Sequence, residues 1–393
     1  MNPDILDSKV QDFINEHLKS DVSALILKGI PFSEITAVDV VEQIEAKNKC
    51  EKKLPSWFQQ SNIYYPNKLN IEQTSSELTA AYKSKLINGT SLIDLTGGFG
   101  VDSFYFARTF QHVVHCEMNP VLSQIASHNF NVLKTDNIDC MANDGLTYLQ
   151  NSSENYDWIY VDPSRRHESK GKVFFLKDCL PNIPQHLDLL WSRSKNMLIK
   201  TSPLLDITIG INELEYIKAI HIVAVNNEVK ELLWILKHGF SGPITIKTIN
   251  LKSRSSERFE FLIADESLIE PSYSEPLTYL YEPNSAVLKS GGFNVLIKAF
   301  NVYKLHKHSH LYTSEMLIEF PGRRFKIIDS IPYNKKQIKK LGLNKANITI
   351  RNFPESVENI RKSFKIKDGG DHYLFFTTDH KNQKIVLICT KIQ

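Results

Sequence analysis

The sequence has few cysteines and no long apolar run, and both shortages exclude classes of protein. Its five cysteines are scattered along 393 residues, and none forms a Cys-x-x-Cys pair. This scatter argues against a zinc site and a disulfide framework, and it fits a reducing compartment. No stretch of about 18 uncharged apolar residues is present, so we expect no membrane-spanning helix. The start, MNPDILDSKV, lacks the basic segment and apolar core of a secretory signal, and we therefore expect a cytoplasmic protein.

The net charge is also small, but it is unevenly distributed. Lys and Arg number 47 and Asp and Glu number 44, which gives a formal charge of +3. Residues 321–393 carry 16 basic and 6 acidic side chains, a balance of +10, whereas residues 1–320 carry 31 and 38, a balance of −7. A basic terminal region favours a polyanionic partner, of which nucleic acid is the commonest. A solvated, lysine-rich surface without a partner is the alternative interpretation.

The pattern of apolar residues divides the chain into four regions. Residues 1–85 have apolar side chains at helical spacing, with Ser33 as an expected helix cap. Over residues 86–265, predicted strands alternate with helices, which is typical of a parallel α/β sheet covered on both faces. Residues 266–320 are interpreted as a small linking domain with a short helical segment. Residues 321–393 give the order β-α-β-α-β-β, and we expect a compact α+β domain there.

A glycine-rich turn follows the first strand of the α/β region. Its sequence is Asp-Leu-Thr-Gly-Gly-Phe-Gly over residues 94–100, with glycines Gly97, Gly98 and Gly100. Such glycines let the backbone come close to a ligand, and the helix that follows presents free N–H groups at its first turn. In an open α/β sheet, ligands bind at the carboxyl ends of strands where the strand order reverses. Taken alone, this turn also fits an ordinary tight turn.

Three acidic residues end the next three predicted strands. Glu117 follows the glycines by about twenty residues, where a carboxylate can accept hydrogen bonds from ribose hydroxyls. Asp144 ends the third strand, where it can accept a hydrogen bond from an adenine amino group. Asp162 ends the fourth strand and faces the reactive end of such a ligand. Met118 and Gly145, which directly follow two of these acids, complete the predicted cofactor pocket.

These residues together resemble the class I S-adenosylmethionine-dependent methyltransferases, over roughly residues 73–240. The family pattern is acidic-x-Gly-x-Gly-x-Gly, and here it is Asp94-x-Thr96-x-Gly98-x-Gly100, with threonine in place of the first glycine. The resemblance implies a Rossmann-like, seven-stranded methyltransferase sheet with S-adenosylmethionine as its cofactor. It also implies that Asp94 and Thr96 belong to the cofactor site.

The segment Asp162-Pro163-Ser164-Arg165-Arg166 resembles the Asp-Pro-Pro-Tyr motif of enzymes that methylate exocyclic amino groups of nucleic-acid bases. In that motif the Asp side chain and the following carbonyl accept hydrogen bonds from the amino nitrogen, so the resemblance implies these roles for Asp162 and Pro163. Arg165 replaces the aromatic residue, and a guanidinium can stack on a base or bind a phosphate. We therefore expect Arg165 and Arg166 to contact the substrate. Pairing with nearby acidic side chains, which would only order the loop, is the alternative.

Motifs along the whole chain narrow the resemblance to a bacterial methyltransferase family with a small ferredoxin-like domain and a carboxyl-terminal THUMP-like domain. The matching residues are 72–77 with Lys83, 94–98, 100–102, 162–166, 281–284 and 320–323. THUMP domains of other enzymes bind structured RNA, so the resemblance implies an RNA partner for residues 321–393. It also implies that Thr74, Ser75 and Ser76 close over the cofactor, although a helix cap accounts for the same residues equally well.

Five further positions have a less specific pattern. Asp102 is expected to serve the start of its own helix. Lys200 follows the fifth strand and either faces the predicted cleft or simply ends the strand. His306, His308 and His310 alternate with other residues, and without a carboxylate or cysteine nearby we expect a solvated loop and no metal site.

We therefore predict a methyltransferase that modifies an exocyclic amino nitrogen of a base in structured RNA such as tRNA or rRNA. One alternative is a small-molecule or protein methyltransferase that uses residues 321–393 to bind another protein. Another is an RNA-binding protein that holds S-adenosylmethionine without transferring its methyl group. The sequence leaves the oligomeric state open.

Overall fold

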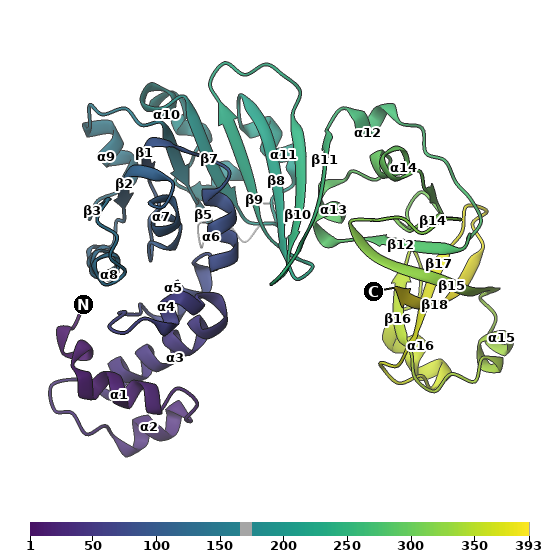
Figure 1. Ribbon diagram of the computed structural model, residues 1–393, viewed down its shortest axis with the longest axis horizontal. Coiled ribbons are helices and arrows are strands. Elements are labelled where there is room, and N and C mark those ends of the chain that lie inside the picture. Colours follow the sequence, from purple (N-terminus) through teal and green to yellow (C-terminus); the bar gives the residue numbers. More distant parts are fainter. Residues whose placement is uncertain (166–174, 393) are drawn as a thin grey trace. The chain divides into compact units, whose positions relative to one another are not determined.

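A computed structural model describes residues 1–165 and 175–392 (Figure 1). The chain forms two compact units, whose boundary crosses a hairpin. One unit consists of Met1–Ile217 and Leu233–Ser241, and the other of Lys218–Leu232 and Gly242–Gln393. Within the described ranges, no helix combines the length and apolarity needed to cross a membrane.

The first unit begins with short helices, as the apolar spacing predicts. They are η1 (Pro3–Leu6), α1 (Ser8–Glu16), α2 (Val22–Lys28), α3 (Ala37–Lys53), α4 (Pro55–Gln59), α5 (Lys68–Gln73) and α6 (Glu77–Ser84). The expected cap at Ser33 is wrong, because α3 begins after Thr36. The Thr36 side chain accepts from the Asp39 N–H at 3.1 Å, and the Asp39 carboxylate accepts from the Thr36 N–H, so the two residues form a capping box.

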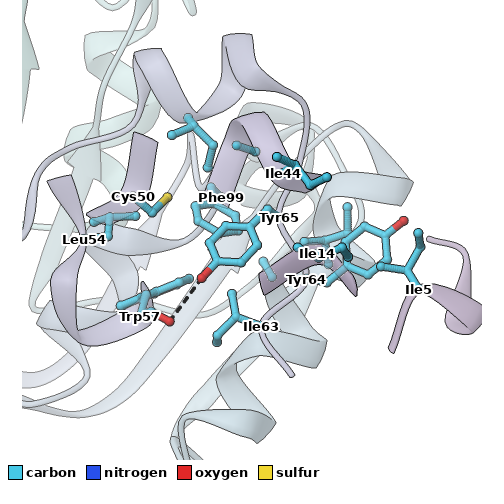
Figure 2. Packing of buried hydrophobic residues seen from close by; sticks show 14 of the residues in the cluster. Ile5, Ile14, Ile44, Cys50, Leu54, Trp57, Ile63, Tyr64, Tyr65 and Phe99 are labelled. Carbon is cyan, nitrogen blue, oxygen red and sulfur yellow. Dashed lines mark hydrogen bonds between the residues drawn. The ribbon is translucent and has the colours of Figure 1, made fainter. Parts of the chain in front are cut away.

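These helices share one hydrophobic core with the glycine turn (Figure 2). The buried Trp57 ring lies 4.9 Å from the ring of Phe99, which belongs to the turn. The hydroxyl of Tyr65 donates to the Trp57 carbonyl at 3.2 Å, so this buried polar group is satisfied. The amino-terminal helices therefore support the predicted cofactor turn directly.

The predicted Rossmann-like sheet is confirmed. The strands of the α/β region are β1 (Gly89–Asp94), β2 (Phe110–Cys116), β3 (Ile138–Met141), β4 (Trp158–Val161), β7 (Asn196–Thr201), β8 (Ile217–Val225) and β9 (Glu228–Lys237). The helices and short elements between them are α7 (Val101–Phe106), α8 (Pro120–Val132), α9 (Gly145–Asn151), β5 (Ser164–Arg165), η2 (Leu176–Asp178), β6 (Cys179–Leu180), η3 (Pro184–His186), α10 (Leu187–Arg193) and α11 (Ile207–Glu213).

The order of these strands places a ligand cleft at β1. The sheet runs β11-β10-β8-β9-β7-β4-β1-β2-β3, and β1 is parallel to both of its neighbours, β2 and β4. The chain therefore moves outward from β1 in both directions, and the carboxyl ends of β1, β2 and β4 meet where the order reverses. The antiparallel pair β10 (Thr245–Leu251) and β11 (Ser256–Leu262) extends the sheet to nine strands.

A second sheet builds the carboxyl-terminal part of the chain. Its strands run in the order β13-β14-β12-β15-β18-β17-β16. The elements in chain order are α12 (Asp265–Leu268), β12 (Tyr279–Pro283), α13 (Ser285–Ser290), α14 (Val295–Phe300), β13 (Tyr303–Lys304), β14 (Tyr312–Ser314), β15 (Gly322–Pro332), α15 (Lys335–Lys340), β16 (Asn347–Arg351), α16 (Val357–Phe364), β17 (His372–Thr378) and β18 (Lys384–Ile392). The β-α-β-α-β-β order is thus confirmed. Because β12 pairs with β15, residues 279–283 and 322–332 share this sheet.

The histidine segment before β14 is only partly the solvated loop that the sequence suggests, since His308 is exposed but His306 and His310 are not. His306 is buried, its Nδ1 accepts from the Asn352 side chain at 2.9 Å, and its Nε2 lies 3.1 Å from the Asn382 side-chain oxygen. The ring of His310 stacks on Phe293 with centroids 3.7 Å apart, and burial lowers the pKa of His310 to about 4. These histidines join loops of the second unit, and no group suited to holding a metal ion occurs among the described residues.

Candidate active site

The three glycines of the turn are explained by different structural requirements. A Cβ on Gly97 would lie 2.3 Å from the buried His115 ring, and one on Gly100 would lie 2.4 Å from Phe130. Both positions therefore need glycine for packing. Gly98 has φ +56° and its nearest neighbour to an added Cβ is 3.9 Å away, so the space beside it is open. Gly98 is the glycine at which the backbone can approach a ligand.

Asp94 braces the turn from beneath. Its carboxylate accepts from the Thr96 N–H at 3.0 Å and from the Ser103 hydroxyl at 2.6 Å. Complete burial raises the pKa of Asp94 to about 7, and those two hydrogen bonds only partly oppose the rise. The Thr96 hydroxyl in turn accepts from the backbone N–H of Asp162 at 2.7 Å. The threonine that replaces the family's first glycine therefore ties the turn to the end of β4.

Glu117, at the end of β2, is held by the backbone on both of its carboxylate oxygens. One accepts from the Gly98 N–H at 2.9 Å and the other from the Asn119 N–H at 2.8 Å. Each oxygen keeps a second lone pair that can accept from a hydroxyl. The adjacent Met118 side chain is 72% exposed, which is a large apolar surface beside the turn. Glu117 and Met118 thus offer acceptors and an apolar surface next to Gly98.

Asp144 and Gly145 lie at the start of α9. One Asp144 oxygen caps this helix by accepting from the Thr147 N–H and hydroxyl, both at 2.8 Å. The other oxygen has no hydrogen-bond partner among the described residues, so it is available to an amino group. A Cβ on Gly145 would lie 2.4 Å from the Leu95 carbonyl oxygen, so Gly145 is needed where α9 packs against the turn.

Asp162, which follows β4, pairs with Lys200 on the neighbouring strand β7. The Lys200 ammonium contacts one carboxylate oxygen, and both side chains are partly shielded from solvent. The other oxygen has no hydrogen-bond partner in the described part of the chain. Of the two interpretations left open for Lys200, its position beside Asp162 supports the one that faces the cleft. Arg165 lies on β5, and Arg166 lies outside the described residues.

Asp102 is the centre of a buried polar network and does not simply serve its helix end, as the sequence suggested. It accepts from the Ser75 hydroxyl at 2.8 Å and the Tyr160 hydroxyl at 2.7 Å, and Lys83 Nζ lies 3.1 Å away. Burial alone would raise the pKa of Asp102, but the charges of Lys83 and Lys200 and the hydroxyl donors together hold that pKa below its usual value. The network connects α6, α7 and β4.

The segment before α6 combines two of the roles considered for it. Ser76 is the N-cap of α6, since its hydroxyl accepts from the Thr79 N–H at 3.3 Å and Thr79 returns a bond to the Ser76 N–H. Ser75 belongs to the Asp102 network. Thr74 is the C-cap of α5. The cap interpretation is therefore confirmed for Ser76, and a cofactor contact of these residues stays a prediction.

The arrangement fits S-adenosylmethionine at the level of donor and acceptor chemistry. The open space at Gly98, the lone pairs of Glu117, the available Asp144 oxygen and the exposed Met118 suit an adenosine group. Asp162 lies at the end of β4, next in the sheet to the turn. Parallel topology with a reversal at β1 and this row of strand-end residues define a class I S-adenosylmethionine-dependent methyltransferase.

Comparisons with known proteins extend this class to a family. Residues 279–321 match a ferredoxin-like domain family and residues 322–391 match the family described as THUMP domain-like. The crystal structure of a candidate methyltransferase from Porphyromonas gingivalis W83 is 31% identical, with a TM-score of 0.91 over 100% of this chain and 99% of that one. The chain therefore belongs to the bacterial methyltransferase family of that protein, which carries ferredoxin-like and THUMP-like domains.

A more distant similarity concerns part of the chain. In an alignment of 91 residues, which covers 21% of this chain, the sequence is 28% identical to the ribosomal RNA small subunit methyltransferase J of Desulfotalea psychrophila. The match spans about a third of that relative, 35% of its length.

Proposed function

We propose that this protein methylates an exocyclic amino nitrogen of a base in structured RNA, such as tRNA or rRNA. The observation that carries the proposal is the state of Asp162. One carboxylate oxygen is held by Lys200 and the backbone N–H is held by Thr96, while the second oxygen has no hydrogen-bond partner among residues 1–165 and 175–392. A hydrogen-bond acceptor held in place at the end of β4 can orient the amino group of a base.

This geometry supports the following roles for the chain's residues. S-adenosylmethionine supplies a methyl group that is already strongly electrophilic, so positioning is the main contribution required of the protein. Glu117 would hold the ribose hydroxyls and Asp144 the adenine amino group. The free oxygen of Asp162 and the carbonyl of Pro163 accept the two amino hydrogens of the base and turn its nitrogen lone pair toward the methyl group. Arg165 and Arg166 contact the base or a neighbouring phosphate.

RNA is the favoured substrate because of the carboxyl-terminal region. Residues 321–393 carry a balance of +10, and most of them match a THUMP domain-like family. A base inside a helix would have to leave its stack to reach Asp162. The curated relative named for ribosomal RNA supports the same substrate class, although it matches only part of this chain.

The experiment that tests the proposal has two arms. Nucleosides from RNA of cells with and without the gene are compared by mass spectrometry, and RNA from the deficient cells is then incubated with the protein and labelled S-adenosylmethionine. We expect one methylated nucleoside to disappear in the first arm and to return in the second. Asp162→Ala should abolish transfer and keep cofactor binding, while Asp136→Ala, an exposed Asp outside the site, should be active. Unchanged RNA in both arms would refute the proposal.

A further inference from the structure

Two sequence motifs that the cofactor site does not use meet in the second unit. Glu282 lies on β12 in the motif at residues 281–284, and Arg323 lies on β15 in the motif at 320–323. The two residues are register partners, and the Arg323 Nε donates to a Glu282 oxygen at 2.5 Å. A Cβ on Gly322 would lie 2.1 Å from the Glu282 carbonyl oxygen, so this close pairing of strands requires glycine.

A second arginine reaches the same carboxylate from another strand. Arg351, the last residue of β16, places Nη2 2.6 Å from the other Glu282 oxygen. Glu282 is 3% exposed, whereas the side chains of Arg323 and Arg351 are 37% and 36% exposed. One buried carboxylate thus holds two guanidinium groups that both reach the surface, and the cluster keeps a net charge of +1.

The orientation of the guanidinium groups is fixed by their surroundings. Arg323 lies over the rings of Phe325 and Phe375, 5.5 and 6.0 Å from their centroids. One Arg351 nitrogen donates to the Ile350 carbonyl at 3.1 Å. Arg323 Nη2 also donates to the Thr349 hydroxyl at 3.4 Å. Each guanidinium has five N–H donors, and the contacts with described residues leave several of them without a partner. Neutralising Glu282 requires only one arginine, so the second charge and the free donors need another explanation.

An open hollow of about 600 Å³ adjoins Arg351 at the carboxyl ends of the parallel strands β16 and β17. Its lining includes Arg351, Phe353, Thr378 and Lys384, and no Asp or Glu occurs among the lining residues. Lys384 is exposed at the start of β18. The hollow therefore combines Lys384, the Arg351 guanidinium whose other contact is Glu282, an aromatic ring, and a Thr378 hydroxyl that donates to the Asn352 carbonyl.

We infer that Arg323 and Arg351, held by Glu282, form with Lys384 a binding site for phosphate groups of an RNA backbone. The inference rests on the proposed function and adds the place where the RNA is held. Rigid guanidinium groups suit phosphate because they can donate two parallel hydrogen bonds, and a buried carboxylate that fixes them lowers the entropy lost on binding. Glu282 is thus a positioning residue, and the arginines are the RNA contacts.

The test uses the full-length protein and a fluorescently labelled RNA fraction, either bulk tRNA or rRNA fragments, from cells lacking the gene. Affinity is measured over a range of salt concentrations for the wild type, Arg351→Gln and the matched control Lys336→Gln, which removes an exposed charge on α15. We expect Arg351→Gln to weaken binding about tenfold and to lower the slope of log Kd against log salt by about one. Lys336→Gln should weaken binding by less than about threefold, because one screened surface charge contributes little.

Several outcomes would overturn the inference. Equal losses for the two variants would assign binding to diffuse charge, and unchanged binding by Arg351→Gln would remove the arginine from the interface. Competition by free AMP or inorganic phosphate at the same concentration as RNA phosphate would assign the site to a small ligand. Thermal unfolding checks each variant, and if Arg351→Gln does not fold, Arg351→Lys is used: it should keep the salt slope and lose affinity. Failure of the proposed function is distinguishable, because the wild type itself would then neither methylate nor bind the RNA.

Discussion

The ammonium group of Lys200 pairs with one oxygen of the Asp162 carboxylate at the ends of the neighbouring parallel strands β7 and β4. This contact occupies one oxygen of Asp162, and the other oxygen has no hydrogen-bond partner among the described residues. Thr96 fixes the backbone of the same residue. The proposed acceptor is therefore held from two sides before any substrate binds, which is the preorganisation that methyl transfer by positioning requires.

Removing Lys200 should impair turnover more than binding. We expect Lys200→Ala to lower kcat roughly 10- to 100-fold, since a misplaced acceptor costs about that much in a reaction that depends on alignment. The KM for S-adenosylmethionine should change little. Lys200→Arg should recover part of the rate, and Lys195→Ala, an exposed lysine before the same strand, should act like the wild type. If Lys200→Ala loses cofactor affinity by the same factor as kcat, this would contradict the role of Lys200 in positioning Asp162.

Substitutions of two glycines of the turn should affect stability and cofactor affinity differently. Gly97→Ala places a Cβ against the His115 ring, so we expect a loss of about 1–3 kcal/mol in the free energy of unfolding. Gly98→Ala meets no neighbour and carries only the cost of a positive φ, about 1–2 kcal/mol, but it fills the space proposed for the ligand. Calorimetric titration with S-adenosylhomocysteine should therefore show a loss of affinity for Gly98→Ala. Relative to its loss of stability, this loss of affinity should be larger than that of Gly97→Ala. Equal affinities for this variant and the wild type would exclude close approach at Gly98.

The raised pKa of Asp94 predicts a pH-dependent stability. The pKa of this carboxyl is 3.8 when it is exposed to water in the unfolded chain and about 7 in the folded protein, so between these pH values the folded state binds the extra proton. Stability therefore falls as pH rises from about 4 to 7, by at most about 1.4 kcal/mol per pH unit from this group. Asp94→Asn should remove that contribution, and denaturant unfolding at pH 5 and pH 7.5 measures it. The stability of the wild type relative to the variant should decrease with pH, and a constant difference would contradict this assignment.

The sequence predicts features that depend on neighbouring residues, but it does not predict contacts between residues that are far apart in the chain. Strand ends, the glycine turn and the acids Glu117 and Asp144 follow from periodicity and spacing. The cap at Thr36 also has a local signal, because Thr36 and Asp39 have the Thr-x-x-Asp spacing of a capping box. By contrast, Thr96 appeared as a departure from a glycine pattern because its bond to Asp162 crosses 66 residues.

The same limit applies to buried charged residues. The sequence indicates Lys83 only as part of a motif. No local rule predicts that a buried lysine contacts Ser75, which precedes α6, and Asp102, which lies on α7. His306 looked solvated because its asparagine partners lie 46 and 76 residues away. Long-range polar contacts of this kind require the tertiary structure.

The buried pair of Lys83 and Asp102 should behave as a coupled unit. Lys83 is fully buried, so Lys83→Met leaves the Asp102 carboxylate without its cation, and we expect a loss of about 3–5 kcal/mol in the free energy of unfolding. Asp102→Asn removes the charge of the carboxylate that faces the Lys83 ammonium and should also be destabilising. The double variant removes both charges, so its loss should be smaller than the sum of the two single losses, which urea unfolding of all four proteins measures. Additive losses would mean that Ser75 and Tyr160, and not the ion pair, hold the connection between α6, α7 and β4.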